Sequence, residues 1–132
     1  MSGLLVDTHV WLWLFTNPER IPRSVRQRLD DGELYLSVAS IFEIAVKYRL
    51  GKLALPQSPA IHVAQRLHEE NVQALPIAVE HALSAADLPP HHHDPFDRLI
   101  IAQALGETLT LVTGDEKMRA YKVPLLWAGR RR

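Results

Sequence analysis

The sequence predicts an α/β fold in which a parallel sheet of about five short strands is covered by helices. Three observations support this fold class. Short apolar runs alternate with helical segments along the chain, which is the order of a parallel sheet with helical crossovers. The first run, Leu4-Leu5-Val6, is apolar on both faces, as expected for a strand covered on both sides. The length of 132 residues suits a single domain, residues 1–132, that is large enough to bury a core.

Each expected strand is a short apolar run bounded by polar or turn-forming residues. The segment 109–113 is the clearest, because it is rich in Thr, Val and Leu. In chain order, strands are expected at residues 4–6, 34–36, 72–76, 109–113 and 123–127.

The helices between these strands begin at capping residues or prolines and end at Gly, Asn or Pro. Ser37 or Ser40 can cap a helix that runs to about residue 50, where Gly51 ends it. The other helices are expected at residues 8–15, 22–29, 61–70, 79–86 and 94–105, with a short helical turn at 116–121.

Composition excludes several classes of protein. Cysteine is absent, which excludes disulfides, thiolate metal sites and cysteine nucleophiles. The apolar stretch 10–15 is too short to cross a bilayer, and no charged segment precedes it as in a signal peptide. We therefore expect a cytoplasmic protein without membrane association. Fifteen Lys and Arg balance fifteen Asp and Glu, which by itself neither indicates nor excludes a nucleic-acid partner.

Two acids directly follow expected strands. Asp7 comes after the first strand, and Asp115 comes after 109–113 with only Gly114 between them. In a parallel sheet, sites lie beyond the carboxyl ends of the strands, so both acids are candidates for one site. The alternative is that each Asp caps the helix that follows it.

Two further acids occur on expected helices. Glu43 lies in a segment that is apolar on nearly every side; it forms a capping box with Ser40, pairs with Lys47, or points into the protein. Asp97 follows the natural cap Asp94, so it is not needed as a cap itself, although interaction with the helix dipole is an alternative.

Four carboxylates at one sheet edge would repel one another unless they bind a divalent cation with oxygen ligands, such as Mg²⁺ or Mn²⁺. Metal binding by these acids would leave fifteen Lys and Arg against eleven other Asp and Glu, a balance that suits a polyanionic substrate.

Four short motifs contain these acids in order along the chain. They are Leu4-Leu5-Val6-Asp7-Thr8-His9; Ser40-Ile41-Phe42-Glu43-Ile44-Ala45 with Lys47 and Gly51-Lys52-Leu53; His92-His93-Asp94-Pro95-Phe96-Asp97-Arg98-Leu99; and Leu111-Val112-Thr113-Gly114-Asp115. Together they cover essentially the whole chain. Their order and spacing resemble those of PIN-domain ribonucleases, most closely the VapC-type toxins of toxin–antitoxin pairs.

The resemblance implies a three-layer α/β/α PIN-like fold and Mg²⁺- or Mn²⁺-dependent endonucleolytic cleavage of RNA. The family's acids correspond to Asp7, Glu43, Asp97 and Asp115, and the supporting residues to Thr8 and Thr113. Asp7 and Asp97 are expected as direct ligands, Glu43 as a ligand or the group that orients water, and Asp115 as a direct or water-mediated ligand. The implied partners are an RNA substrate, a cognate VapB-like antitoxin and a second copy of the chain in a homodimer.

Other polar residues near these motifs have simpler interpretations. The run His91-His92-His93 is interpreted as a solvated loop, with contact between His92 and a phosphate as the alternative. Arg98 is expected to pair with Asp94 or a neighbouring acid, and Lys117 to be exposed; both are also candidates for contact with RNA. Trp11 and Trp13 are expected in the core or a dimer interface, and residues 128–132 as a flexible basic tail.

Two other functions are compatible with parts of the pattern, and a third fits poorly. The same chemistry would serve RNA processing without a toxin role, and a PIN module without catalysis would bind RNA or protein. A dehalogenase-type phosphatase would require an Asp at position 9, where this chain has His9.

Overall fold

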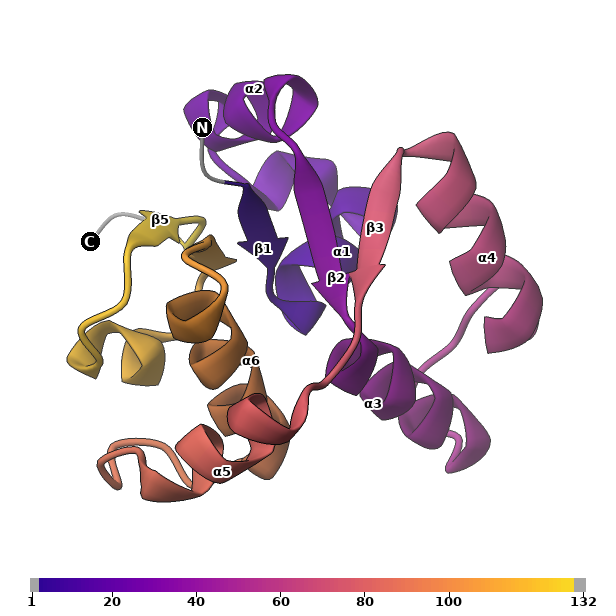
Figure 1. Cartoon of the computed structure of the whole chain (residues 1–132). Helices are drawn as coiled ribbons and strands as arrows, with labels where there is room; N and C mark the ends of the chain where they lie inside the picture. Colours follow the sequence, from indigo (N-terminus) through magenta and orange to yellow (C-terminus); the bar gives the residue numbers. More distant parts are fainter. Residues whose placement is uncertain (1–2, 130–132) are drawn as a thin grey trace.

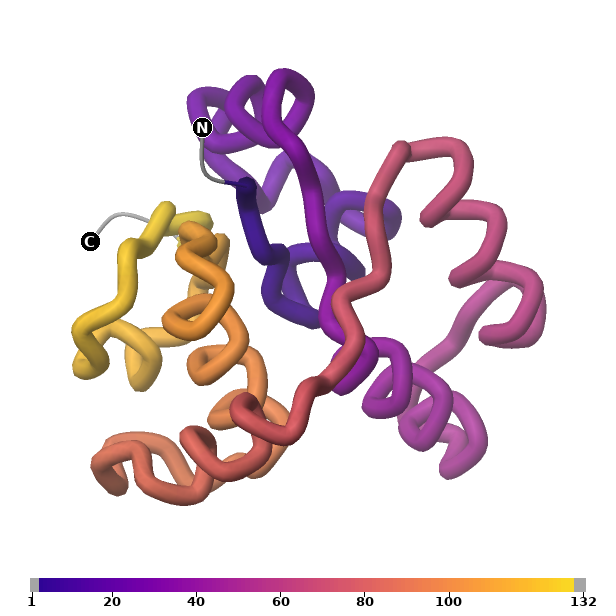
Figure 2. The backbone as a smooth tube through the Cα atoms, in the orientation of Figure 1, coloured from indigo at the N-terminus to yellow at the C-terminus, as the bar shows by residue number. Residues whose placement is uncertain are grey.

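The computed structural model describes residues 3–129, and its centre is a parallel sheet of five strands. The strands are β1 (Leu4–Val6), β2 (Leu34–Ser37), β3 (Val72–Leu75), β4 (Thr110–Thr113) and β5 (Leu125–Trp127). Their order across the sheet is β3-β2-β1-β4-β5, so the first strand is the central one. Figure 2 shows the same arrangement along the chain, with the N-terminal strand between the magenta and the orange segments.

Helices connect the strands as the sequence predicts, with small shifts at their ends. The α-helices are α1 (Thr8–Thr16), α2 (Arg23–Asp31), α3 (Val38–Arg49), α4 (Pro59–Glu69), α5 (Val79–Asp87) and α6 (Pro95–Gly106). Two short 3₁₀ turns are Pro18–Arg20, which the sequence analysis did not anticipate, and Glu116–Ala120.

The two faces of the sheet have separate cores because successive strand residues point to opposite sides. Leu4 and Val6 of β1 pack on one side into a core that includes Trp11 of α1, as expected for this tryptophan. Leu5 packs on the other side with Ile100 of α6. Helices α1 to α4 contribute to the first core, and α5 packs against α6 outside the second (Figure 1). The predicted three-layer α/β/α arrangement is therefore confirmed.

The ends of α3 illustrate how local chemistry sets the boundaries. The Ser37 side chain accepts a hydrogen bond from the Ala39 N–H at 3.0 Å, which caps the helix at its start. Gly51 has a φ of +74°, the left-handed conformation in which glycine is favoured after a helix. Of the two caps that the sequence allows, Ser37 is the one used.

The C-terminal strand leads directly into a residue that still belongs to the folded domain. Ala128 is buried, and its N–H donates to the Thr113 carbonyl at 2.8 Å. The arginines 130–132 of the expected basic tail lie outside the described residues. Across residues 3–129, every helix falls short of the length and apolar character that a membrane span requires. The cytoplasmic location stays a prediction.

Candidate metal centre

The central strands bring the first and the last of the four acids together. Val6 of β1 pairs with Val112 of β4, so Asp7 and Thr113 are neighbours at the carboxyl ends of these strands. The buried Thr113 Oγ1 donates a hydrogen bond to Asp7 Oδ2 at 2.8 Å and accepts one from the Asp115 N–H at 3.1 Å. A single hydroxyl therefore ties Asp7 to the segment that carries Asp115.

Asp97 enters the site from the first turn of α6. Asp94 caps this helix by accepting a hydrogen bond from the Phe96 N–H at 2.8 Å, so the Asp97 side chain is not used as the cap. Asp97 is only 8% exposed. Burial, followed by the repulsion of surrounding carboxylates with Asp7 foremost, raises the pKa of Asp97 to about 8. The other carboxylates that raise it are those of Asp94, Glu43 and Asp115, so the charges of the other three predicted acids all act on Asp97 at this point.

Glu43 reaches the same point from α3, which packs against α6 at the rings of Phe42 and Phe96, 5.8 Å apart. Its carboxylate is buried, and Oε2 forms an ion pair with Lys47 Nζ at 2.8 Å. The pairing of Glu43 with the lysine one turn later is therefore confirmed. Figure 1 shows α3 and α6 on either side of the edge at which β1 and β2 end.

The capping box that was considered for Ser40 and Glu43 is wrong. Ser37 caps α3, and Ser40 lies within the helix, where its Oγ accepts a hydrogen bond from Thr8 Oγ1 at 2.7 Å. This buried contact joins the first turn of α1 to α3. Thr8 thus links α1, which follows Asp7, to α3, which carries Glu43; its supporting role in the site stays a prediction.

Two carboxylate oxygens in this cluster are buried without a partner. Asp7 Oδ1 and Glu43 Oε1 are enclosed, and no hydrogen-bond donor of residues 3–129 reaches either of them. Burial also raises the pKa of Asp7, which the hydrogen bond from Thr113 only partly opposes. Buried carboxylate oxygens are costly unless a cation or a donor meets them, and hard divalent cations prefer such oxygens. The residues therefore fit a Mg²⁺ or Mn²⁺ ion, which Asp7, Glu43, Asp97 and Asp115 would hold.

A histidine lies inside the acidic cluster. His92 is 6% exposed, and its Nε2 is 2.9 Å from Asp115 Oδ2 and 3.0 Å from Asp97 Oδ2. The solvated-loop interpretation is thus wrong for His92, although His91 and His93 are exposed. Because Nε2 faces two carboxylates, it is not directed toward a phosphate in this arrangement. Its position two residues before the Asp94 cap is the signal that sequence reasoning overlooked.

Comparison with known proteins identifies the family of this fold. The PIN domain family matches residues 4–124 of the chain. The chain belongs to the PIN-domain family. This match confirms the predicted fold class. It also confirms the resemblance to PIN domains.

Relatives of this PIN domain are ribonucleases of the VapC type. Ribonuclease VapC22 of Mycobacterium tuberculosis is 32% identical over 126 residues, which cover 94% of this chain and 95% of the relative. Ribonuclease VapC16 of the same organism is 34% identical over 77 residues, which cover 52% and 53% of the two chains.

Solved structures share the fold of this PIN domain. A chain of VapBC2 from Rickettsia felis, bound to a fragment of promoter DNA, matches with a TM-score of 0.73 at 14% identity and covers 96% of this chain and 99% of its own length. A toxin–antitoxin complex from Klebsiella pneumoniae matches with a TM-score of 0.64 at 19% identity, covering 95% and 96%. At these identities the matches establish the fold alone.

The ion pair expected for Arg98 is wrong in this PIN domain. Its guanidinium donates to backbone carbonyls at the end of α5 and in the loop that follows, among them Ala85 at 2.8 Å, Leu88 at 2.7 Å and His92 at 3.1 Å. These bonds direct the guanidinium toward the backbone of the loop that carries His92, and contact of Arg98 with RNA stays a prediction. Lys117 is exposed beside Asp115, and its contact with RNA stays a prediction.

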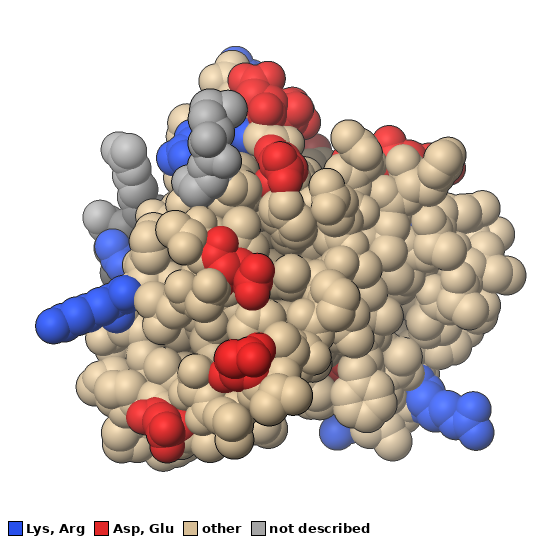
Figure 3. Space-filling model, viewed as in Figure 1, with Lys and Arg blue, Asp and Glu red and all other residues tan. Residues whose placement is uncertain are grey.

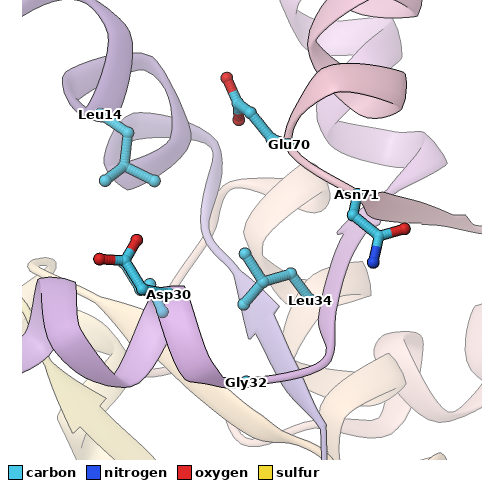
Figure 4. A pocket seen from close by; sticks show the side chains of 7 residues that line it. Leu14, Asp30, Gly32, Leu34, Glu70 and Asn71 are labelled. Atoms are coloured by element: carbon cyan, nitrogen blue, oxygen red, sulfur yellow. The ribbon is translucent and has the colours of Figure 1, made fainter.

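A cavity of about 390 Å³ lies at the other end of the strands from the acidic cluster. It is lined by Leu14, Leu29, Asp30, Gly32, Leu34, Glu70 and Asn71 (Figure 4). Leu34 begins β2 and Asn71 directly precedes β3, so the cavity is at the amino ends of the strands. The PIN domain's acidic cluster and this cavity are therefore separate features.

Proposed function

We propose that this PIN domain is a Mg²⁺- or Mn²⁺-dependent endoribonuclease. The observation that carries the proposal is the convergence of four carboxylates from separate parts of the chain, two of which keep a buried oxygen without a partner. Carboxylates whose oxygens all had hydrogen-bond partners would be explained by a structural role. Buried carboxylate oxygens without a partner instead favour a site that a cation completes. The names of the VapC relatives, which are ribonucleases, support RNA as the substrate.

Each acid has a role that follows from its surroundings. Asp7 and Asp97 are the most deeply desolvated acids with raised pKa values, and we assign them as direct cation ligands. Lys47 engages Glu43 Oε2, which leaves Oε1 for the cation or for the attacking water. Asp115, one-third exposed at its side chain, completes the set from the solvent side. A bound cation supplies activation of water and stabilisation of the charge that develops on the phosphodiester.

The charge distribution is compatible with a polyanionic substrate. On the face shown in Figure 3, Lys and Arg side chains lie at the edges and acidic side chains are scattered between them. Cation binding would neutralise the acids at the site, leaving the basic side chains of α3 and the Glu116–Ala120 turn to meet phosphates. Lys117 is the nearest of these in sequence to the site acids.

We further propose that the protein is the toxin of a toxin–antitoxin pair with a VapB-like antitoxin. Val38 and Phe42 lie on one face of α3 with 38% and 60% of their surface exposed, beside the acid Glu43. An exposed apolar surface next to a catalytic site is typical of a docking surface for a protein partner. The complexes among the solved structures with this fold support the same proposal.

The homodimer is also a proposal. Val79 and Leu83 are one turn apart on α5 and leave 72% and 65% of their surface exposed. This second apolar surface supports self-association away from the acidic site. Light scattering on the purified protein measures the oligomeric state directly.

The decisive experiment incubates antitoxin-free protein with total cellular RNA in Mg²⁺, in Mn²⁺ and in EDTA. The test variant combines Asp7→Asn with Asp97→Asn, and Asp30→Asn, an exposed acid at the distant cavity, is the matched control. Discrete cuts are expected from the wild type and the control in the presence of a cation only. Cuts that persist in the folded double variant, or the absence of cuts with either cation, would contradict the proposal.

Growth of cells that express the protein separates the toxin from an RNA-processing enzyme. The wild type is expected to slow growth, and the double variant is expected to leave growth unchanged. Co-expression of the antitoxin should restore growth to cells carrying the wild type. Normal growth with an RNA-cleaving wild type would favour the processing role.

A further inference from the structure

Hydrogen bonds outside the acidic cluster hold the loop that carries His92. The His92 backbone N–H donates to the Tyr121 hydroxyl at 2.9 Å, and that hydroxyl donates to the Pro89 carbonyl at 2.6 Å. Arg98 donates to the carbonyls of Pro89 and His92, both at 3.1 Å. The backbone that carries the imidazole is therefore held by the Tyr121 and Arg98 side chains as well as by the carboxylates that the ring meets.

Hydrogen bonding also determines which ring nitrogen carries the proton. His92 Nδ1 is 3.2 Å from the backbone nitrogen of Asp94 and accepts its N–H. An accepting Nδ1 has no proton, so the neutral ring carries its proton on Nε2. Nε2–H then points at the acids, donating to Asp115 Oδ2 at 2.9 Å, with Asp97 Oδ2 at 3.0 Å.

A protonated Nε2 is a donor, and it has no lone pair to offer a cation. The three groups His92, Asp97 and Asp115 have their polar atoms within 4.8 Å of one another, as metal ligands do. The Asp94 N–H distinguishes a metal ligand from a hydrogen-bond donor at Nε2. If Nε2 bound a cation, the proton would lie on Nδ1, where it would face the Asp94 N–H, which is itself a donor. The arrangement favours two carboxylate ligands beside one N–H group, which bonds Asp115 and contacts Asp97.

We propose that His92 is a positioning residue, whose Nε2–H bonds the Asp115 carboxylate and, in contact with Asp97 Oδ2, keeps both groups in the orientation that receives the divalent cation. The inference rests on the proposed function, because it takes the acidic cluster as a cation site. A carboxylate has about four lone-pair positions, so a hydrogen bond to one oxygen fixes the group and leaves positions for the cation. Donors that orient metal-binding carboxylates commonly determine the affinity of the site.

A second histidine provides a matched control within the same chain. His81 Nδ1 accepts the Ala78 N–H at 2.9 Å, and His81 Nε2 is 2.9 Å from Glu107 Oε2. The ring is buried like that of His92, but it joins the start of α5 to the end of α6. Its partner Glu107 is not one of the clustered acids. Loss of this contact would affect folding without removing a donor from the cation site.

The test measures Mg²⁺ and Mn²⁺ binding by calorimetry at one pH, without RNA, for the wild type and three variants. His92→Asn keeps an acceptor near Nδ1 for the Asp94 N–H and loses the donor at the Nε2 position. His92→Gln places an amide N–H near the Nε2 position and loses the acceptor. His81→Asn is the control, and circular dichroism confirms that each variant is folded.

We expect His92→Asn to weaken the binding of both cations by about 10- to 100-fold and to leave their affinity ratio unchanged. His92→Gln should recover most of the affinity, and His81→Asn should bind both cations as the wild type does. This rescue by a different donor is an effect that a purely structural role would not produce.

Three results would overturn the inference. If His92→Asn binds both cations as tightly as the wild type, the donor has no positioning role. If His92→Asn and His92→Gln both lose Mn²⁺ affinity much more than Mg²⁺ affinity, the imidazole is a ligand, since nitrogen ligands favour Mn²⁺ over Mg²⁺. If His81→Asn weakens binding as much as His92→Asn, the loss reflects general destabilisation. Absence of cation binding by the wild type would instead refute the proposed function.

Discussion

Asp7 and Arg66 are both charged and almost fully buried, at 1% and 3% exposure, but the fold surrounds them differently. Arg66 of α4 donates to the Trp11 carbonyl at 2.8 Å and to the Glu70 carboxylate at 2.6 Å and 3.1 Å. Its guanidinium also lies 3.7 Å from the centre of the Trp11 ring, and Nη1 is the one guanidinium nitrogen without a hydrogen-bond partner among residues 3–129. Asp7 has the Thr113 hydroxyl on one oxygen and no partner on the other.

The difference separates a structural charge from one that is kept for a ligand. The groups around Arg66 offset the cost of burying its charge through an ion pair, a carbonyl and an aromatic face. The groups around Asp7 leave burial as the largest influence, which raises its pKa, and Asp115 adds repulsion. A fold retains such an unmatched charge when a ligand present in the active protein satisfies it.

The largest effect is expected from Asp7→Asn. Loss of a ligand should reduce RNA cleavage by about 100-fold or more, because a cation contributes several kcal/mol to the transition state. The same change should leave the free energy of unfolding in EDTA unchanged or raise it, since it removes a buried negative charge. Chemical denaturation and RNA cleavage, measured on the same preparation, check the two parts. A strong loss of stability would show that Asp7 is structural.

Arg66→Leu is expected to have the opposite effect, lower stability with unchanged cation binding. It should lower the free energy of unfolding by about 2–4 kcal/mol, because a paired and stacked buried group is lost and Glu70 keeps its charge. Cation affinity of the folded protein should stay at the wild-type value. Denaturation with urea gives the stability, and calorimetry with Mn²⁺ gives the affinity. Reduced Mn²⁺ affinity in the folded variant would show that the surroundings of Arg66 and the acidic cluster at Asp7 are not independent.

A smaller effect concerns the pH dependence of stability in EDTA. The pKa of Asp97 rises from 3.8 to about 8 in the folded protein. Between these values the folded chain holds a proton that the unfolded chain has released, so stability falls as pH rises through this range. The contribution is at most about 1.4 kcal/mol per pH unit. Urea denaturation from pH 5 to 7.5 measures it.

Asp97→Asn provides the reference for this measurement. The difference in unfolding free energy between the wild type and the variant should change across the range, and saturating cation should abolish that change. A difference that is constant with pH would show that Asp97 is ionised in the folded protein without a cation.

The sequence predicted much of the site because its information was local. Asp7 and Asp115 follow strands, and Asp94 caps α6 in place of Asp97, so these acids became candidates by position alone. The alternative capping role is confirmed for Asp115, which accepts the Lys117 N–H at 3.0 Å, and is wrong for Asp7. His92 and Arg98 were misjudged because their partners are contributed by other elements. His92 meets Asp115, 23 residues away, and Arg98 meets carbonyls of α5 and the following loop.

By itself, the sequence determined the alternation of strands and helices, most of their ends, and the placement of acids at the carboxyl edge. These features depend on side-chain periodicity, capping and backbone conformation within a few residues. The tertiary structure alone decided which carboxylate oxygens remain unmatched and which imidazole joins them. Those outcomes depend on packing between distant segments. Thr113 and Asp7 are 106 residues apart, and strand pattern placed them at one edge of the sheet without deciding which oxygen the hydroxyl meets.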